Sequence, residues 1–249
     1  MPLSANSLFH FTKEKDSLYG ILNDTFRPSY CREDLSIGGK QYSIRAPMVS
    51  FCDIPLSEIK SHIEKYGSYG IGLSKKWGKR KNLNPVLYVE QDSFLSRSYE
   101  RALSRFVLGE AQAKEVTDPD SLAVLDVLRY IKNYEGSLTR SNGEHDPMYR
   151  FSDEREWRYV PEVSADCDMI LEDRLFQKEE IREMAMEKIS RLRLSFAADD
   201  VRYIVIEKDS EINDLVGYLR QIKNRRYSPE VVDRLTTRIL TRAQIMEDI

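Results

Sequence analysis

Short apolar runs rich in β-branched and aromatic residues recur through this chain, and they constrain its fold more than any other feature. The clearest run is VRYIVIE at residues 201–207, and LFHFT at 8–12 and PMVSFCDI at 47–54 have the same character. Such residues pack well on a pleated surface, so each run predicts a β-strand. Segments with helical spacing lie between these runs. The chain therefore predicts an α+β fold with a mixed β-sheet core.

We expect a single domain over residues 1–249. No sequence period repeats, and no Pro-, Ser- or Gly-rich tract separates two halves. Residues 93–135 have helical spacing without strong strand signals, which indicates a helical insertion between two groups of strands. Residues 228–249 are amphipathic and place Pro229 at a first-turn position after Ser228, which predicts a C-terminal helical segment.

Three further segments carry local predictions. Residues 56–66 have the spacing of a helix with Ser57 as its N-cap. Residues 28–46 contain one proline and two adjacent glycines, and we expect them to be irregular. Residues 139–150 are polar and rich in turn formers, which predicts an exposed loop.

The composition is that of an ordinary folded protein with a densely charged surface. Lys and Arg number 38 and Asp and Glu 41, a formal net charge of −3, so a uniformly basic coat is absent. No apolar run approaches the roughly 18–20 residues that cross a bilayer, and the start lacks a secretory pattern, which predicts a cytoplasmic protein without membrane contact. The three cysteines suggest no disulfide framework, and His62 and His145 lack metal-ligand spacing, so no metal site is expected.

His10 is the first candidate for chemistry. In a strand over residues 8–12, His10 and Thr12 point to one side and Phe9 and Phe11 to the other. Two aromatic rings can then be buried while an imidazole and a hydroxyl face a cleft. The alternative is a histidine at the rim of the sheet with a satisfied hydrogen bond.

The second candidate is the pair Glu154 and Glu156 in SDEREWRYVP. If this segment is a strand, both carboxylates share one face with Arg158. Their repulsion can raise the pKa of one of them, which the arginine opposes. Such a pair suits a carboxylate that stabilises a cationic sugar transition state. The alternative is a solvated strand face.

Two further stretches point to nucleotides or nucleic acids. Tyr66 and Tyr69, among glycines at 67, 70 and 72, offer rings for a planar base, although the glycines equally suit a bulged strand and form no phosphate loop. A basic run at 75–82 and a shorter one at 222–228 could contact phosphates while a ring stacks on a base; a solvated loop is the more ordinary reading. The contact residues predicted in the first run are Lys75, Lys76, Trp77, Lys79 and Arg80.

Taken in order, these segments resemble the AbiGi family of abortive phage-resistance proteins. The resemblance covers most of the chain, and it is most specific from Pro47 to Gly78. Members of that family are usually described as the antitoxin half of a two-gene abortive-infection system. The resemblance thus implies a role in phage defence and a cognate toxin or antitoxin encoded nearby.

A more distant resemblance is to ADP-ribosyltransferases of the DarT type and to poly-ADP-ribose polymerases. These enzymes use a His on a first strand, a second strand that leads into a helix, and a Glu on a later strand. The resemblance implies an ADP-ribosyltransferase fold with NAD as substrate, His10 orienting the ribose and Glu156 holding its hydroxyl as the glycosidic bond breaks. It also implies a nicotinamide pocket lined by Ser50, Phe51, Ser57 and His62.

Three functional hypotheses follow. The first is an NAD-dependent ADP-ribosyltransferase-like toxin that modifies a nucleic acid or a protein. The second is a non-catalytic antitoxin or regulator that binds a toxin, and its own operator or RNA as a further possibility, through the helices at 93–135 and 228–249. The third is a nucleic-acid sensor built around Trp77 and its lysines.

Overall fold

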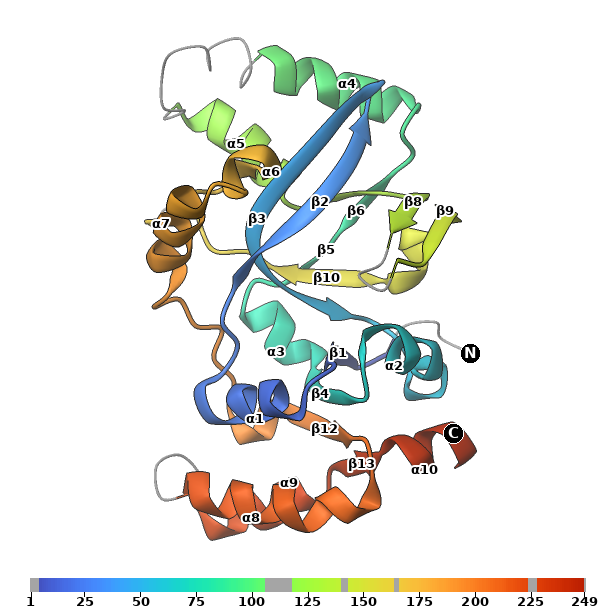
Figure 1. Cartoon of the computed structure of the whole chain (residues 1–249), viewed down its shortest axis with the longest axis vertical. Coiled ribbons are helices and arrows are strands. Elements are labelled where there is room, and N and C mark those ends of the chain that lie inside the picture. Colours follow the sequence, from blue (N-terminus) through green and yellow to red (C-terminus); the bar gives the residue numbers. More distant parts are fainter. Residues whose placement is uncertain (1–4, 106–117, 140–142, 164–165, 224–227, 249) are drawn as a thin grey trace. The chain divides into compact units, whose positions relative to one another are not determined.

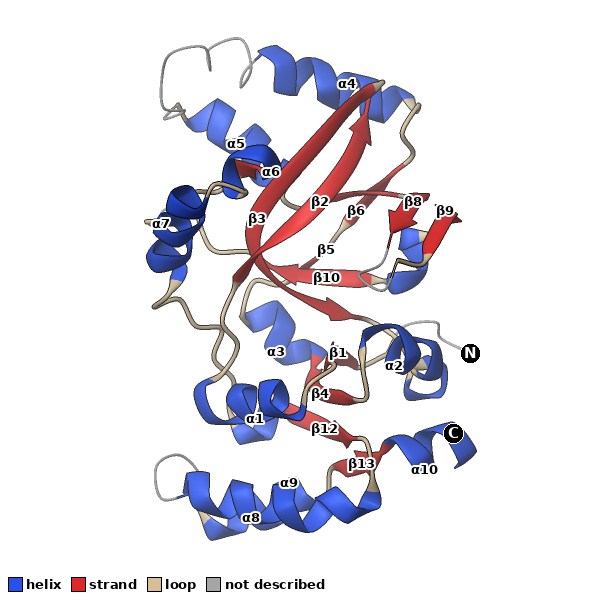
Figure 2. Cartoon of the chain, viewed as in Figure 1, coloured by secondary structure: helices blue, strands red, loops and turns tan. Residues whose placement is uncertain are grey.

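A computed structural model describes residues 5–105, 118–139, 143–163, 166–223 and 228–248. It is an α+β structure in which strands and helices are mixed along the chain, as predicted (Figure 2). The chain divides into two compact units. The first contains Met1–Arg27, Ser50–Leu83 and Arg193–Ile249, and the second contains Pro28–Val49 and Asn84–Leu192. This division leaves the number of domains open, so the single domain stays a prediction.

The sheet of the first unit is mixed. Its strands follow the order β13 (Ile239–Thr241), β12 (Val201–Ile206), β4 (Tyr69–Ser74), β1 (Ser7–Thr12) and the end of β3 (Lys40–Cys52). Only the pair β12–β13 is parallel; β12–β4, β4–β1 and β1–β3 are antiparallel. The strands predicted at 8–12, 47–54 and 201–207 are therefore confirmed.

Helices complete the first unit, and some of them pack on its sheet. They are α1 (Lys15–Asp24), α2 (Lys60–Tyr66), α3 (Lys75–Arg80), α8 (Ile212–Lys223), α9 (Pro229–Thr236) and α10 (Arg242–Asp248), with 3-10 turns η1 (Leu56–Glu58), η4 (Ala198–Asp200) and η5 (Asp209–Glu211). A cluster of buried apolar residues from β1, β3, α2, β12 and α10 forms part of its core, with Phe9, Ile59 and Val205 at most 1% exposed.

The structure corrects two predictions about these helices. The segment 56–66 is a 3-10 turn followed by α2, whose N-cap is Ile59, so Ser57 is not the cap. Residues 228–249 are not wholly helical, because β13 lies between α9 and α10. The start of α9 is as predicted: the Ser228 hydroxyl accepts from the amide of Val231, and Pro229 follows it.

The second unit is built on the hairpin of β2 (Ser29–Ile37) and β3, which run side by side in Figure 1. The prediction that residues 28–46 are irregular is wrong. Gly38 and Gly39 have φ of +57° and +83°, which suits the two-residue turn of a tight hairpin. β3 also pairs with β11 (Leu171–Glu172) and with β10 (Glu156–Tyr159), and β10 pairs with β5 (Asn84–Pro85).

The other described elements of the second unit include two smaller strand pairs and several helices. β6 (Leu87–Val89) and β7 (Ile131–Asn133) are parallel, and β8 (Gly136–Thr139) and β9 (His145–Tyr149) are antiparallel. The expected loop at 139–150 is thus corrected to a strand over 145–149, and its residues 140–142 lie outside the described residues. The helices are α4 (Phe94–Leu103), α5 (Pro119–Leu128), α6 (Asp173–Phe176) and α7 (Glu179–Ile189), with a 3-10 turn η3 (Phe151–Glu154). α4 and α5 lie in the expected helical insertion, whose residues 106–117 are outside the described residues.

Candidate functional site

His10 lies on β1 in the first unit. Its Nδ1 is 2.8 Å from the carbonyl oxygen of Ser50, so Nδ1 carries the proton and donates it. The ring packs edge-on against Phe26 and tilted against Phe51, with centroids 5.2 and 5.6 Å away. Burial lowers the pKa of the imidazole, and the hydrogen bond to Ser50 opposes this only in part. The imidazole is therefore neutral at pH 7, with Nε2 as its acceptor nitrogen.

The other residues predicted to line a nicotinamide pocket differ in their burial and in their contacts. Phe51 is 3% exposed and contacts Phe26 and Trp77, so its ring is part of a packed aromatic core. Thr12 Oγ1 accepts a long hydrogen bond from the amide of Glu14, at 3.4 Å. Ser57 is exposed, and His62 is buried with its ring 5.8 Å from that of Tyr66. The structure thus brings His10, Ser50 and Phe51 together.

Tyr69 is anchored by carboxylates. It is 7% exposed, and its hydroxyl donates to Glu211 Oε1 at 2.9 Å and lies 3.4 Å from Glu207 Oε2. Burial first, and then these carboxylates, raise the pKa of the phenol, so it stays protonated. The glycines beside it in β4 have a packing role: a Cβ at position 70 or 72 would lie 2.7 or 2.8 Å from the ring of Phe11 or Phe9.

The basic run does not present a ring to solvent. It forms the helix α3, in which Trp77 is 0% exposed and its indole N–H donates to the carbonyl oxygen of Ser195 at 3.0 Å. The prediction that Trp77 stacks on a base is therefore wrong, because the ring belongs to the core. Lys75 forms an ion pair with Asp53 at 2.7 Å, and Arg80 forms one with Asp200 at 2.8 Å.

Two members of that run, Lys76 and Lys79, are exposed and remain available for phosphate contacts. The second basic run falls largely on residues 224–227, which lie outside the described residues. A contact with nucleic acid through these lysines stays a prediction.

Glu156 lies in the second unit, at the start of β10, and is 6% exposed. Arg158 binds its carboxylate through two hydrogen bonds, Nε to Oε1 at 2.7 Å and Nη2 to Oε2 at 3.0 Å. Lys132 on β7 donates to Glu156 Oε2 at 3.0 Å and pairs with Glu154 Oε2 at 3.1 Å. Glu154 is in η3 and not on the strand, so the expected shared strand face is corrected; Lys132 is what brings the two carboxylates together.

A third carboxylate completes this buried charge cluster, which consists of Glu33, Lys132, Glu154, Glu156 and Arg158. Glu33 Oε1 on β2 accepts from Arg158 Nη2 at 2.7 Å. Burial raises the pKa of Glu33 against the opposing charges of Arg158 and Lys132. Burial alone would lower the pKa of Lys132, but the surrounding carboxylates raise it. The cations therefore keep their charge. Glu33, whose pKa is raised, is a carboxylate that the sequence did not single out, and the raised pKa expected for one of Glu154 and Glu156 stays a prediction.

A polar cavity of about 630 Å³ adjoins this buried charge cluster. Glu33 and Lys132 line it together with residues of β2, β7 and β8, including Asn133 and Ser137. Asn133 already binds both backbone groups of Ser36, with Oδ1 accepting at 2.7 Å and Nδ2 donating at 2.8 Å. The cavity wall is therefore held rigid by side chain to backbone contacts.

Glu33 and Lys132 have no local sequence signature. They come from strands about a hundred residues apart, and their neighbours along the chain do not suggest an ion pair. The charged residues beside Glu156 in the sequence include Glu154 and Arg158 but neither Glu33 nor Lys132. His10 belongs to the first unit and Glu156 to the second. Their convergence in one NAD site stays a prediction.

The described residues contain neither a metal-ligand cluster nor a membrane-spanning helix. No group of three or more His, Cys, Asp or Glu side chains there could hold a metal ion. No helix formed by those residues is long and apolar enough to cross a membrane.

Comparisons with known proteins assign the chain to a class. It is 28% identical over 222 residues to the abortive phage resistance protein AbiGi of Lactococcus lactis subsp. cremoris, which covers 81% of this chain and 88% of that relative. No solved structure matches, so the ADP-ribosyltransferase fold stays a prediction. The class is that of abortive phage resistance proteins.

The family follows from a second match. A family model of AbiGi, described as an abortive phage resistance protein and antitoxin, matches residues 24–207, well over half of the chain. The chain belongs to the AbiGi family.

Proposed function

We propose that this protein is the antitoxin half of an abortive-infection pair and acts by binding a cognate toxin protein. The description of the family as an antitoxin supports the role. The observation that carries the proposal is an exposed apolar pair at the start of α4. Phe94 is 84% exposed and Leu95 is 65% exposed, although both are large apolar side chains.

The orientation of α4 is fixed by its opposite face. Ser96 is 0% exposed, and its hydroxyl accepts from the amide of Gly38 at 2.8 Å, while Leu103 is 2% exposed in a core cluster. The face that carries Phe94 and Leu95 is therefore directed to solvent.

Arginines surround this apolar pair. The Arg97 guanidinium lies 4.7 Å from the centre of the Phe94 ring, and Arg101 is exposed one turn further along the helix. Aromatic anchors and arginines are enriched at the energetic centres of protein interfaces. This composition favours a partner protein that has an apolar groove with an acidic rim. We call Phe94, Leu95, Arg97 and Arg101 the α4 surface.

The surroundings of Glu156 also support binding over catalysis. A carboxylate that stabilises an oxocarbenium-like sugar must direct its charge toward the substrate. The charge of Glu156 is directed toward Arg158 and Lys132, and the side chain is almost fully buried.

Co-expression with the protein encoded beside this gene tests the proposal. The wild-type chain should restore growth of cells that express this neighbour and form a complex measurable by calorimetry. Phe94→Ala/Leu95→Ala should weaken the complex by at least about tenfold, since interface anchors contribute about 2 kcal/mol or more. Met184→Ala/Met186→Ala on α7 is the matched control, because those side chains are 65% and 42% exposed. A complex unaffected by the α4 variant, or no complex, contradicts the proposal.

The rival is NAD-dependent ADP-ribosyl transfer, favoured by the neutral imidazole of His10 with its acceptor Nε2. Our proposal expects no NAD consumption by the purified chain. NAD consumption that is lost in Glu156→Gln, in a variant that still folds, would replace the antitoxin proposal with the transferase.

A further inference from the structure

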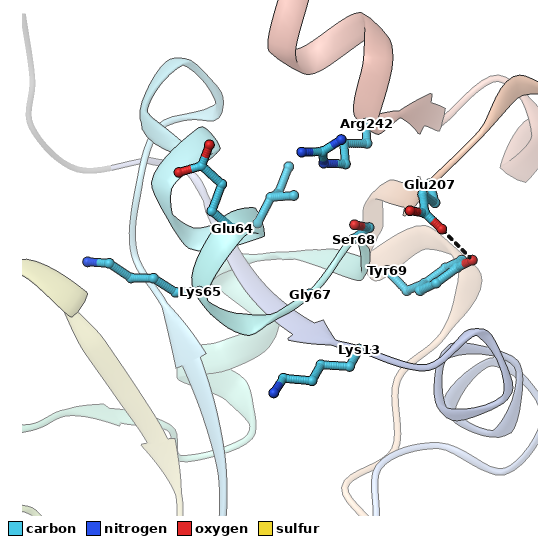
Figure 3. A pocket seen from close by; sticks show the side chains of 9 residues that line it. Lys13, Glu64, Lys65, Gly67, Ser68, Tyr69, Glu207 and Arg242 are labelled. Atoms are coloured by element: carbon cyan, nitrogen blue, oxygen red, sulfur yellow. Dashed lines mark hydrogen bonds between the residues drawn. The ribbon is translucent and has the colours of Figure 1, made fainter. Parts of the chain in front are cut away.

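The first unit contains a cavity that the proposed antitoxin role does not use. It has a volume of about 520 Å³ and lies where β1, α2, β4 and α10 approach one another (Figure 3). Its charged lining residues are Lys13, Glu64, Lys65, Glu207 and Arg242. The three cations come from three separate segments, the residue after β1, the helix α2 and the start of α10.

Two of these cations have no partner in the described part of the chain. No described residue forms a hydrogen bond or an ion pair with the side chain of Lys13 or of Arg242. Of the carboxylates, Glu207 lies within hydrogen-bonding distance of the Tyr69 hydroxyl, as the dashed line in Figure 3 marks. Three cations against two carboxylates, one of them held by Tyr69, leave the cavity with a net positive charge.

The floor of the cavity is fixed by Gly67. Its φ is +123°, and a Cβ there would lie 2.3 Å from the carbonyl oxygen of Thr12 and 2.6 Å from the Cα of Lys13. Only glycine allows this approach. This close approach of Gly67 holds the backbone before Ser68 against the end of β1. Lys13 and Ser68 therefore line the same cavity.

We propose that this cavity binds a phosphate group, with Lys13 and Arg242 as its charged ligands and Ser68 as a hydroxyl donor. Phosphate oxygens are strong acceptors, and charge-assisted hydrogen bonds to lysine and arginine are about twice as strong as neutral ones. The volume is sufficient for a small phosphorylated molecule of mononucleotide size. A phosphate of a single-stranded nucleic acid offers the same chemistry, and the test separates the two sources.

The test titrates the full chain by calorimetry with inorganic pyrophosphate, with ATP and with single-stranded DNA of about ten nucleotides. Pyrophosphate and ATP should bind, and Lys13→Ala/Arg242→Ala should weaken both by about tenfold or more. The matched control is Arg202→Ala/Arg220→Ala, which removes two exposed cations of the same unit that do not line the cavity. Thermal unfolding of each variant shows whether it is folded.

Each outcome either supports the phosphate site or overturns it. Binding of DNA alone, lost in the Lys13/Arg242 variant, keeps the phosphate site and assigns it to nucleic acid. Binding that the control variant weakens equally reflects general surface charge and overturns the site. Undiminished binding in the Lys13/Arg242 variant, or no binding of any probe up to about 10 mM, also overturns it. Toxin binding through the α4 surface is unaffected by this result.

Discussion

Arg158 binds Glu156 two positions before it on β10 through both carboxylate oxygens, at 2.7 and 3.0 Å. The same guanidinium donates to the carbonyl oxygen of Arg129 at 2.8 Å and to Glu33 at 2.7 Å. Arg158 is 0% exposed. This buried cation, with all three guanidinium nitrogens engaged, links β2, β10 and the C-terminal end of α5 in the second unit. We therefore expect its loss to lower the stability of the fold.

Arg158→Met should lower the free energy of unfolding by about 3–5 kcal/mol, because it leaves the three carboxylates of the buried charge cluster with Lys132 as the one remaining cation of that cluster. Urea unfolding followed by circular dichroism measures this. Arg174→Met, which breaks an exposed pair with Glu172 at 3.5 Å, is the control and should change stability by less than about 1 kcal/mol. Equal losses in the two variants would contradict a structural role for the buried charge cluster.

Stability should fall as the pH drops below the ordinary histidine value of 6.5, because the folded pKa of His10 lies below it. Below that pH the unfolded chain binds a proton at His10 that the folded chain does not bind. The contribution of His10 to the free energy of unfolding is therefore present above that pH and is lost as the pH falls. His10→Asn keeps an N–H near the place of Nδ1 and does not titrate. Its free energy of unfolding should depend less on pH between about 7.5 and 5.5, by up to about 1.4 kcal/mol per pH unit. Parallel curves for the two proteins would refute this.

Gly38→Ala should destabilise the second unit more than Gly39→Ala does. Both positions have positive φ, which costs about 1–2 kcal/mol for a residue with a side chain. A Cβ at position 38 would also lie 2.7 Å from the Cβ of Glu100 on α4, whereas nothing lies within 4 Å of one at position 39. We expect a difference of about 1 kcal/mol or more in urea unfolding. A larger loss of stability in Gly39→Ala than in Gly38→Ala would contradict this prediction.

Trp77→Phe should lower stability by about 1–3 kcal/mol, because the carbonyl oxygen of Ser195 loses the indole N–H as its donor. The same variant should bind single-stranded DNA no differently from the wild type, since the ring is fully buried. Lys76→Ala/Lys79→Ala changes only exposed cations and should reduce any DNA affinity, with a smaller salt dependence. DNA binding that depends on Trp77 and not on these lysines would restore the stacking hypothesis.

The strands were the most predictable elements because their signal is local. β1, the end of β3 and β12 coincide with the runs rich in aromatic and β-branched residues that predict them. The signal for the turn at Gly38 and Gly39 is equally local, but two adjacent glycines suit an irregular segment as well as a tight hairpin turn, and the pairing of β2 with β3 selects the hairpin. The prediction that Ser57 caps a helix is wrong because residues 56–58 form a 3-10 turn and α2 begins only after Ile59.

The sequence by itself determined the α+β class, the principal strands and the family, because residue type and spacing along the chain decide whether a segment is a strand or a helix. Only the tertiary structure decided that Trp77 is buried, that Lys132 binds Glu156 while Arg158 binds Glu33, and that Lys13 and Arg242 line one cavity. These contacts join residues far apart in the chain. They form because distant segments bury their apolar faces together, and no local pattern records which segments those are.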